Sequence, residues 1–179
     1  MLGSIIFLVS SGILAPEKKN GAHLGSTYLS VTATCRDNPS CVFSGENLTV
    51  DIVIKNESTV DIGYPLQFVT RRGPSLKLID NKSGEERPLR TNLAPHRLLE
   101  EFTIIKPGDS IALDAIISQH TILALSTGQV DLTAEVVPAA DIQVNGNLPL
   151  VPFHSAAKLR IKAADAVEHV ENSDSGLGK

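Results

Sequence analysis

Residues 45–65 read GENLTVDIVIKNESTVDIGYP, and this stretch decides the fold. Branched apolar residues occupy every second position from Leu48 to Ile54, and mostly polar residues stand between them. A period of two predicts a half-buried strand with one apolar face and one polar face. A polar turn follows, and Val60 and Ile62 resume the alternation on the next expected strand. Because the apolar face needs a cover, the stretch predicts a second sheet packed against the first.

The same alternation of apolar and polar residues recurs along the rest of the chain. Residues 26–35, 128–137 and 157–161 repeat it, and turn signals separate the strands at intervals of about ten residues. No helical period of useful length competes with this pattern. Roughly seven to nine short strands predict an all-β fold, a two-sheet antiparallel immunoglobulin-like sandwich.

Several segments between these strands carry their own predictions. An extended run that includes Leu66 is expected to continue as far as Arg71. Residues 75–79 and 86–90 flank a turn cluster and predict a hairpin, with Pro88 confined to a sheet edge because proline lacks an N–H group.

Three further segments predict turns or irregular structure. The Pro-Gly pair at 107–108 suits a type II turn before a return strand. Residues 118–126 allow a short turn of helix. Residues 138–155 are rich in proline and hold an Asn145-Gly146 pair, so they predict a small hairpin or an irregular excursion.

The two cysteines indicate an oxidising compartment. Cys35 and Cys41 stand six positions apart around an Asn-Pro turn, a spacing that suits a short loop closed by a disulfide. A free buried pair of thiols is the alternative. We therefore expect a secreted or periplasmic protein with no membrane span in its mature form.

The expected organisation is one domain with two terminal segments. Residues 1–22 form a signal or apolar N-terminal segment, residues 23–162 the β-sandwich domain, and residues 163–179 a polar, disordered tail. The apolar run near the N-terminus is too short to span a bilayer, and no Lys or Arg precedes Ile5. A weak export signal, a mis-assigned start and a buried first strand all remain open.

Composition argues against some classes of partner. The formal net charge is −4, and the sixteen Lys and Arg are scattered, so the sequence predicts no nucleic-acid binding. The chain has no Trp and seven aromatic residues, too few for base-stacking platforms or flat carbohydrate-binding strips. Another protein is the expected partner.

No local motif predicts catalysis or metal binding. The five histidines have no H-x-H, H-x₃-H or H-E-x-x-H spacing, and no G-x-S-x-G elbow is present. The sequence therefore predicts no metal, no cofactor and no catalytic residue. Arg71, Arg72, Arg87 and Arg90 could form a basic patch suited to a carboxylate-bearing partner, although a solvated edge that resists aggregation is the favoured interpretation.

Residues 52–58 end a strand in the pattern V-x-V-x-N-x-S, and a Pro-Gly turn and a Gly-x-Val-x-Leu-x-Ala strand follow. This order resembles immunoglobulin-like bacterial modules, including the intracellular proteinase inhibitor family of bacilli and the N-terminal segment of peptidyl-Lys metalloendopeptidases. The resemblance covers Leu48 to Val136 and implies a sandwich that inhibits or accompanies a protease. The tyrosine corner of many such domains is absent, because residues 128–130 read Gly-Gln-Val.

Two classes of function follow. The first is a non-catalytic, extracellular or periplasmic protein-binding module, with a protease inhibitor or protease-associated domain as its specific form. Its contact loops are expected at Arg71–Pro74, Thr91–Arg97 and Pro138–Pro152, because these are long or rich in Pro and Gly. The candidate contact residues are Arg71, Arg72, Asn92, His96, Arg97, Asn145 and Gly146.

The alternative is a small hydrolase or metal-dependent enzyme. Its site would have to be assembled by folding from scattered histidines and carboxylates, with His96, His120 and His154 as the candidate histidines.

Overall fold

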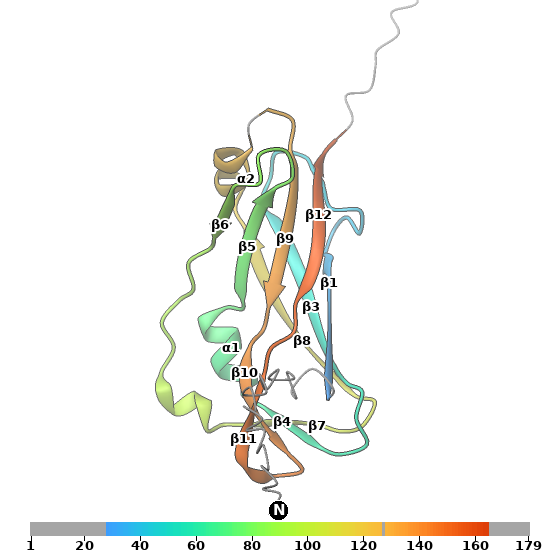
Figure 1. Ribbon diagram of the computed structural model, residues 1–179, viewed down its shortest axis with the longest axis vertical. Coiled ribbons are helices and arrows are strands. Elements are labelled where there is room, and N and C mark those ends of the chain that lie inside the picture. Colours follow the sequence, from blue (N-terminus) through green and yellow to red (C-terminus); the bar gives the residue numbers. More distant parts are fainter. Residues whose placement is uncertain (1–27, 127, 165–179) are drawn as a thin grey trace, which may run out of the picture.

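The computed structural model describes residues 28–126 and 128–164, and strands dominate them (Figure 1). The twelve strands of these residues are β1 (Leu29–Cys35), β2 (Val42–Phe43), β3 (Leu48–Asn56), β4 (Ile62–Tyr64), β5 (Ser75–Asp80), β6 (Glu86–Pro88), β7 (Thr103–Ile105), β8 (Ser110–Ile117), β9 (Asp131–Val137), β10 (Ala140–Val144), β11 (Asn147–Phe153) and β12 (Ala157–Ala163). The helices are α1 (Leu66–Arg72), the 3-10 helix η2 (His96–Leu99) and α2 (Gln119–Leu125).

The strands form three sheets. A three-stranded sheet in the order β1-β3-β8 lies behind a five-stranded sheet in the order β2-β12-β9-β5-β6 (Figure 1). A four-stranded sheet in the order β11-β10-β4-β7 lies at one end of the molecule. The predicted all-β sandwich is confirmed. The predicted seven to nine strands are too few, and the short β2 pairs with β12 in parallel rather than antiparallel.

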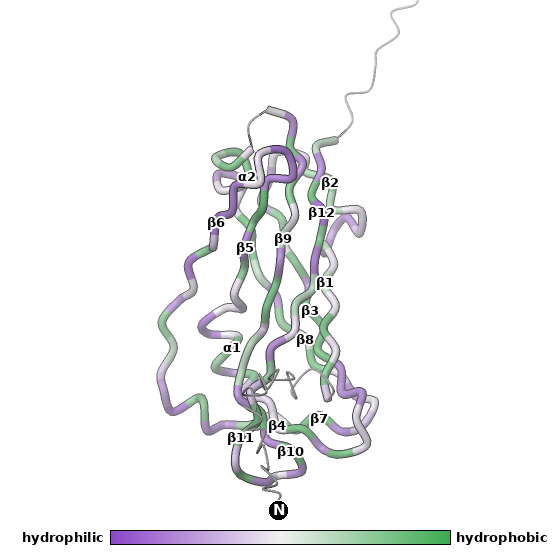
Figure 2. Tube along the Cα trace, in the orientation of Figure 1, coloured by the Kyte–Doolittle hydropathy of each residue, from purple (hydrophilic) through white to green (hydrophobic). Residues whose placement is uncertain are grey.

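Strand β3 has the phase that its sequence predicts. Leu48, Val50, Ile52 and Ile54 are buried, and the residues between them are half-buried or exposed. The strand is central in its sheet, with β1 on one side and β8 on the other. The alternation of hydrophilic and hydrophobic residues can be followed along the strands in Figure 2. In the facing sheet, Leu132 is equally buried.

Asn56 connects three parts of the fold at the end of β3. Its side chain is fully buried, and its Nδ2 donates to the carbonyl oxygens of Val60 and Ile105, at 2.8 Å each. Its Oδ1 accepts from the backbone N–H and the hydroxyl of Ser58. Each polar atom of the side chain therefore has a partner, as a buried amide requires. This explains the Asn and Ser of the N-x-S pattern without any functional role.

Helix α1 corrects the prediction of an extended run through Leu66. Pro65 cannot donate to a sheet ladder and stands at the start of the helix. Leu66 and Val69 are three positions apart and both pack against the core, while the residue between Val69 and Arg71 is exposed. That spacing is helical, and the competing period of two does not hold across the segment.

The Pro-Gly turn before β8 is confirmed, but its two strands do not pair with each other. Gly108 has a φ of +81°, which the third position of a type II turn requires. Strand β7 pairs with β4, whereas β8 pairs with β3, so the turn crosses from one sheet to another. The predicted hairpins are β5–β6 and β10–β11, and α2 is the predicted turn of helix.

The Cys35–Cys41 disulfide is present, with the two Cα atoms 5.3 Å apart, so the alternative of free thiols is wrong. Both cysteines are buried. Strand β2 follows the bridge directly and pairs with the end of β12. The bridge therefore ties the end of β1 to the five-stranded sheet.

Tyr64 ties the four-stranded sheet to the end of β9. Its ring is buried against Phe153, and its hydroxyl donates to the carbonyl oxygen of Pro138 at 2.8 Å. Burial raises the pKa of Tyr64 well above its ordinary value, so the hydroxyl stays a donor.

Two predictions fall partly or wholly outside the described residues. The N-terminal segment 1–22 lies outside them, as does the predicted tail from residue 165 onward. Strand β12 itself extends to Ala163. Within the described ranges, no helix has the length and apolar character that crossing a membrane requires.

Candidate functional site

Two of the three predicted contact loops lie together. The backbone N–H of Asn92 donates to the carbonyl oxygen of Arg72 at 2.7 Å, which joins the segment after β6 to the end of α1. Helix α1 ends there because Gly73 follows with a φ of +81°, and its N–H donates to the carbonyl oxygen of Val69. The loops Arg71–Pro74 and Thr91–Arg97 therefore form one continuous surface.

This surface borders a cleft of about 380 Å³. One wall is the end of α1 and the start of β5, another is the segment after β6, and the third is β8. In Figure 1 the segment between β6 and η2 stands away from the sheets on that side. We call this space the arginine cleft. Its lining residues are Thr70, Arg72, Gly73, Pro74, Leu76, Leu89, Arg90, Thr91, Asn92, Asp114, Ala115 and Ile116.

The arginines of the chain fall into two groups. Three form ion pairs with carboxylates: Arg36, Arg87 and Arg160. The other four have no ion pair within residues 28–126 and 128–164: Arg71, Arg72, Arg90 and Arg97. All four of the second group lie in or beside the two joined loops. The predicted basic patch is thus divided, because Arg87 is paired while Arg72 and Arg90 line the arginine cleft.

The paired arginines have structural roles. Arg160 makes two hydrogen bonds to the carboxylate of Asp131, at 2.9 and 2.8 Å, and Asn81 donates a third. These hydrogen bonds hold the pKa of Asp131 well below its ordinary range and raise the pKa of Arg160. Arg36 is held in the same way by Asp51, and its pKa is likewise raised.

One carboxylate lines the arginine cleft. Asp114 lies on β8, and its Oδ2 is 3.9 Å from a guanidinium nitrogen of Arg36. The lining therefore carries two arginines without an ion pair in the described chain and one acid that already has a cation beside it. The excess positive charge suits a carboxylate, which a guanidinium can bind through two parallel hydrogen bonds.

The rim of this surface also exposes apolar groups. Leu93 is 100% exposed between Asn92 and Pro95, and Ile116 is 61% exposed on β8. The segment between β6 and η2 mixes hydrophilic and hydrophobic stretches (Figure 2). A fully exposed leucine beside arginines that lack an ion pair in the described part of the chain is the combination of apolar anchor and charged rim that protein interfaces use.

The β10–β11 turn of the third predicted loop lies elsewhere, although Ala139 at the start of that loop lines a second pocket together with Arg72. Asn145 and Gly146 form the β10–β11 turn, with φ angles of +53° and +70°, and the N–H of Asn145 donates to the carbonyl oxygen of Asp61. Neither residue lines the arginine cleft. Leu148, next to this turn, is 76% exposed. His96 and Arg97 lie in η2, directly after the joined loops.

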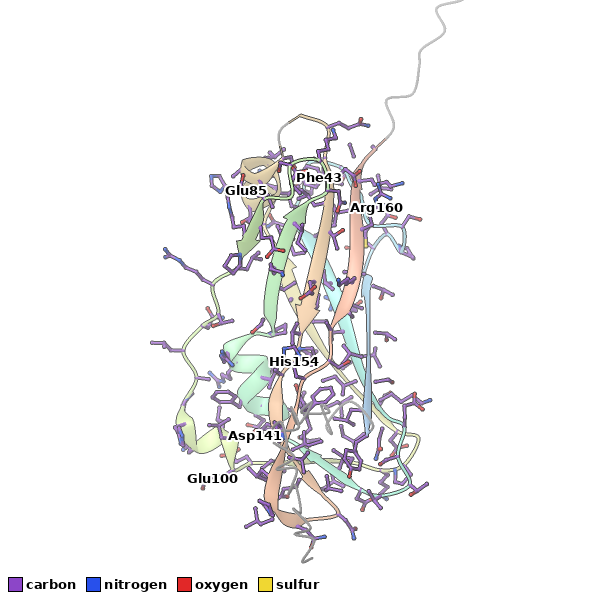
Figure 3. All side chains as sticks on the ribbon, in the orientation of Figure 1. Phe43, Glu85, Glu100, Asp141, His154 and Arg160 are labelled. Atoms are coloured by element: carbon purple, nitrogen blue, oxygen red, sulfur yellow. A yellow bond between two sulfur atoms is a disulfide. The ribbon has the colours of Figure 1, made fainter. Side chains whose placement is uncertain are left out.

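The three candidate histidines of the enzyme alternative lie on separate elements. His96 is in η2, His120 is in α2, and His154 is in the connection between β11 and β12. Figure 3 places His154 well away from the end of the molecule that holds Glu85. Among the described residues, no group of three or more His, Cys, Asp or Glu is arranged to hold a metal ion.

Sequence reasoning missed two features of the site. It did not predict that β8 would form a wall, because the residues of the cleft come from segments far apart in the chain. It also did not separate Arg87 from Arg90. The signal for that was the acid two positions before Arg87, Glu85, which binds it at 3.2 Å.

Comparisons with known proteins identify neither a family nor a function for this chain. The sequence matches no protein-family model and none of the curated proteins. Among solved structures, a structural genomics target shares 10% identity, with 82% of this chain and 94% of that chain covered and a TM-score of 0.43. A protein from Bordetella pertussis that carries the name ApaA shares 10% identity over 77% of this chain and 94% of its own, with a TM-score of 0.39.

A β-glucosidase from Erythrobacter marinus matches at 9% identity and a TM-score of 0.39. The match covers 76% of this chain but only 15% of the glucosidase. These similarities are too low to carry a functional argument. None of the three is named as a proteinase inhibitor or a metalloendopeptidase, so the resemblance to those families stays a prediction.

Proposed function

We propose that this protein is a non-catalytic protein-binding module whose contact surface is the arginine cleft and the two loops beside it. The observation that carries the proposal is the position of the four arginines that have no ion pair in the described chain. All four lie in or next to these loops, whereas the arginines elsewhere are neutralised by acids of the same domain. Cations left without a partner on one surface favour an anionic partner.

The frame of the site supports the same proposal. The loops stand on a sandwich whose central strands bury their inward-facing apolar residues, and the hydrogen bond from Asn92 to Arg72 fixes one loop to the other. Loops held on a rigid scaffold lose less entropy on binding. Leu93 offers an apolar anchor beside the charges.

The specific form of the function rests on the resemblance and on the disulfide. An exported protein is supported by the Cys35–Cys41 bridge, because such bonds persist in oxidising compartments. A protease is the class of partner that the resemblance implies, either as a target of inhibition or as an associated enzyme. We therefore propose that the protein is exported and that its partner is a protease.

The test is capture of extracellular proteins from the source organism by the immobilised full chain. The variant replaces both cleft arginines, Arg72→Gln with Arg90→Gln, and the matched control is Arg87→Gln, which lies three positions from Arg90 but outside the cleft. A specific partner should bind the wild type and the control equally, and the double variant at least about tenfold more weakly. Thermal unfolding should be nearly unchanged in both.

Two results would overturn the proposal. The first is a specific partner that binds the double variant as tightly as the wild type. The second is hydrolysis of an ester, peptide or glycoside substrate by the purified protein, with the activity lost when His96, His120 or His154 is replaced.

A further inference from the structure

The arginine cleft runs along the edge of β8. Three consecutive residues of this strand, Asp114, Ala115 and Ile116, line it. Successive side chains of a strand point to opposite faces of the sheet, so a cleft on one face would be lined by every second residue. Only a cleft beside the edge of the strand can be lined by three in a row.

That edge has no neighbouring strand in the described part of the chain. β8 is the last strand of the order β1-β3-β8, and the cleft lies on the side away from β3. In an antiparallel pair, alternate residues direct both their N–H and their C=O away from the partner. At least one of the residues from Asp114 to Ile116 therefore presents both groups to the cleft.

The other sheet edges are protected in ways that β8 is not. β6 ends in Pro88, and β11 contains Pro149 and Pro152, which have no N–H to donate. β2 and β7 have only two and three residues, and β1 lies beside β12. β8 has eight residues and no proline. An edge of this length without proline is suited to pairing with another extended segment.

We propose that β8 binds an extended, carboxylate-bearing peptide segment of a partner by strand addition, with Arg72 and Arg90 holding the carboxylate. The inference rests on the proposed function and specifies its mode of recognition. Backbone hydrogen bonds to β8 give affinity, and the arginines give specificity, which is the usual division in strand addition. Leu76, Leu89 and Ile116 contact the apolar side chains of the segment.

The charge of the cleft favours an acidic segment of another protein over a second copy of this chain as the occupant. A second copy of this chain would offer its own β8, which has a single acid, Asp114, and that acid already has Arg36 beside it. An acidic segment of another protein complements both Arg72 and Arg90, which have no ion pair among the described residues. The segment after β6 also stands opposite β8 and leaves a cleft between them, which suits a single peptide strand.

The test selects peptides from a random library displayed on phage, using the full chain as bait. Selected peptides should carry Asp or Glu at a fixed position and no proline in the neighbouring residues. Synthetic copies should bind Arg72→Gln with Arg90→Gln at least about tenfold more weakly than the wild type, and Arg87→Gln as well as the wild type.

Backbone methylation of the selected peptide then tests strand pairing directly. One set of alternate N-methyl groups should abolish binding, because those N–H groups face β8, and the other set should leave it intact. The alternation requires no knowledge of which residues of β8 face the cleft. Slower amide exchange at alternate residues of Asp114–Ile116 on peptide binding should accompany it.

Several outcomes would overturn strand addition. They are failure to select any peptide, selected peptides without acids, methylation effects without alternation, and a concentration-dependent dimer that Ile116→Lys dissociates. If such a result is found while the arginine double variant still loses the captured partner, strand addition fails and the proposed function stands. If the double variant retains that partner, the proposed function itself fails.

Discussion

The two edges of the sandwich treat their polar groups differently. At the closed edge, β1 lies beside β12, the Cys35–Cys41 bridge joins the sheets, and Arg160 is neutralised by an acid on the neighbouring strand. At the open edge, β8 faces the arginine cleft, and Arg72 and Arg90 have no ion pair in the described chain. Arg160 at the closed edge is therefore neutralised within the domain, whereas Arg72 and Arg90 at the open edge have no acid partner among the described residues.

This difference separates residues that stabilise the fold from residues that are available for binding. Figure 3 shows Arg160 on β12, at the closed edge. Substitutions in the core and at the closed edge should therefore change the free energy of unfolding. Substitutions of the same residue types at the open edge should leave it nearly unchanged.

The largest effect is expected for the core strands that both edges share. Replacing Ile52 or Leu132 with Ala should lower the free energy of unfolding by about 2–5 kcal/mol, because each side chain is fully buried and leaves a cavity. Urea denaturation measures the change. Thr49→Ala, on the outer face of β3, is the control, and an equal loss there would mean that the phase of β3 is wrong.

The next effect concerns Asn56. Asn56→Ala should lower the free energy of unfolding by about 1–3 kcal/mol, because the buried carbonyl oxygen of Ile105 loses its Nδ2 donor. The carbonyl oxygen of Val60 also loses that donor but still accepts from the hydroxyl of Ser58 at 3.1 Å. The matched control is Asn92→Ala at the open edge, whose exposed side chain should matter by less than about 0.5 kcal/mol. Urea denaturation measures the free energy of unfolding of both variants. Equal losses would mean that the buried amide of Asn56 stabilises the fold no more than the exposed amide of Asn92.

The disulfide comes third. Replacing both cysteines with Ser should cost about 2 kcal/mol, the chain-entropy value for so short a ring. Unreduced, denatured protein should show no free thiol in a thiol titration. Two free thiols would remove the bridge from the closed edge and, with it, the support for an oxidising compartment.

Local patterns predicted most of the core because burial follows the period of two. The strands around Ile52 and Leu132 carry that period over several residues, and their phase is correct. Helix α1 was missed because its apolar residues lie close together, and two of them also fit an extended run. Tyr64 stands apart from the position where a tyrosine corner was expected, so its hydrogen bond to Pro138 carried no sequence signal.

The candidate site was predictable only in part. The composition of the loops indicated Arg72 and Asn92 as contact residues, and the structure joins them by a hydrogen bond. The wall formed by β8 was not predictable, because the Pro-Gly turn gives no information on which strand β8 pairs with. Sheet partners distant in sequence are selected by the packing of the whole domain.

The smallest predicted effect compares one arginine from each edge. Because its pKa is lowered in the folded state, Asp131 contributes stability above its ordinary pKa of about 3.9. This contribution is lost as the pH falls through that value toward the lower folded pKa. Arg160→Gln removes the main cause of the shift, so its acid unfolding midpoint, followed by circular dichroism, should move to higher pH.

Arg90→Gln should leave the acid unfolding midpoint where it is, because no acid of the described chain forms an ion pair with Arg90. The two variants remove the same charge, so a general effect of net charge on acid unfolding would shift both equally. A shift confined to Arg160→Gln shows a local partner at the closed edge alone. Loss of a cation by itself relieves repulsion in the positively charged chain at low pH, so a general effect would move both midpoints to lower pH. An equal shift of Arg90→Gln to higher pH would instead mean that an acid of its own chain neutralises Arg90, and the carboxylate of a partner would then have to displace that acid.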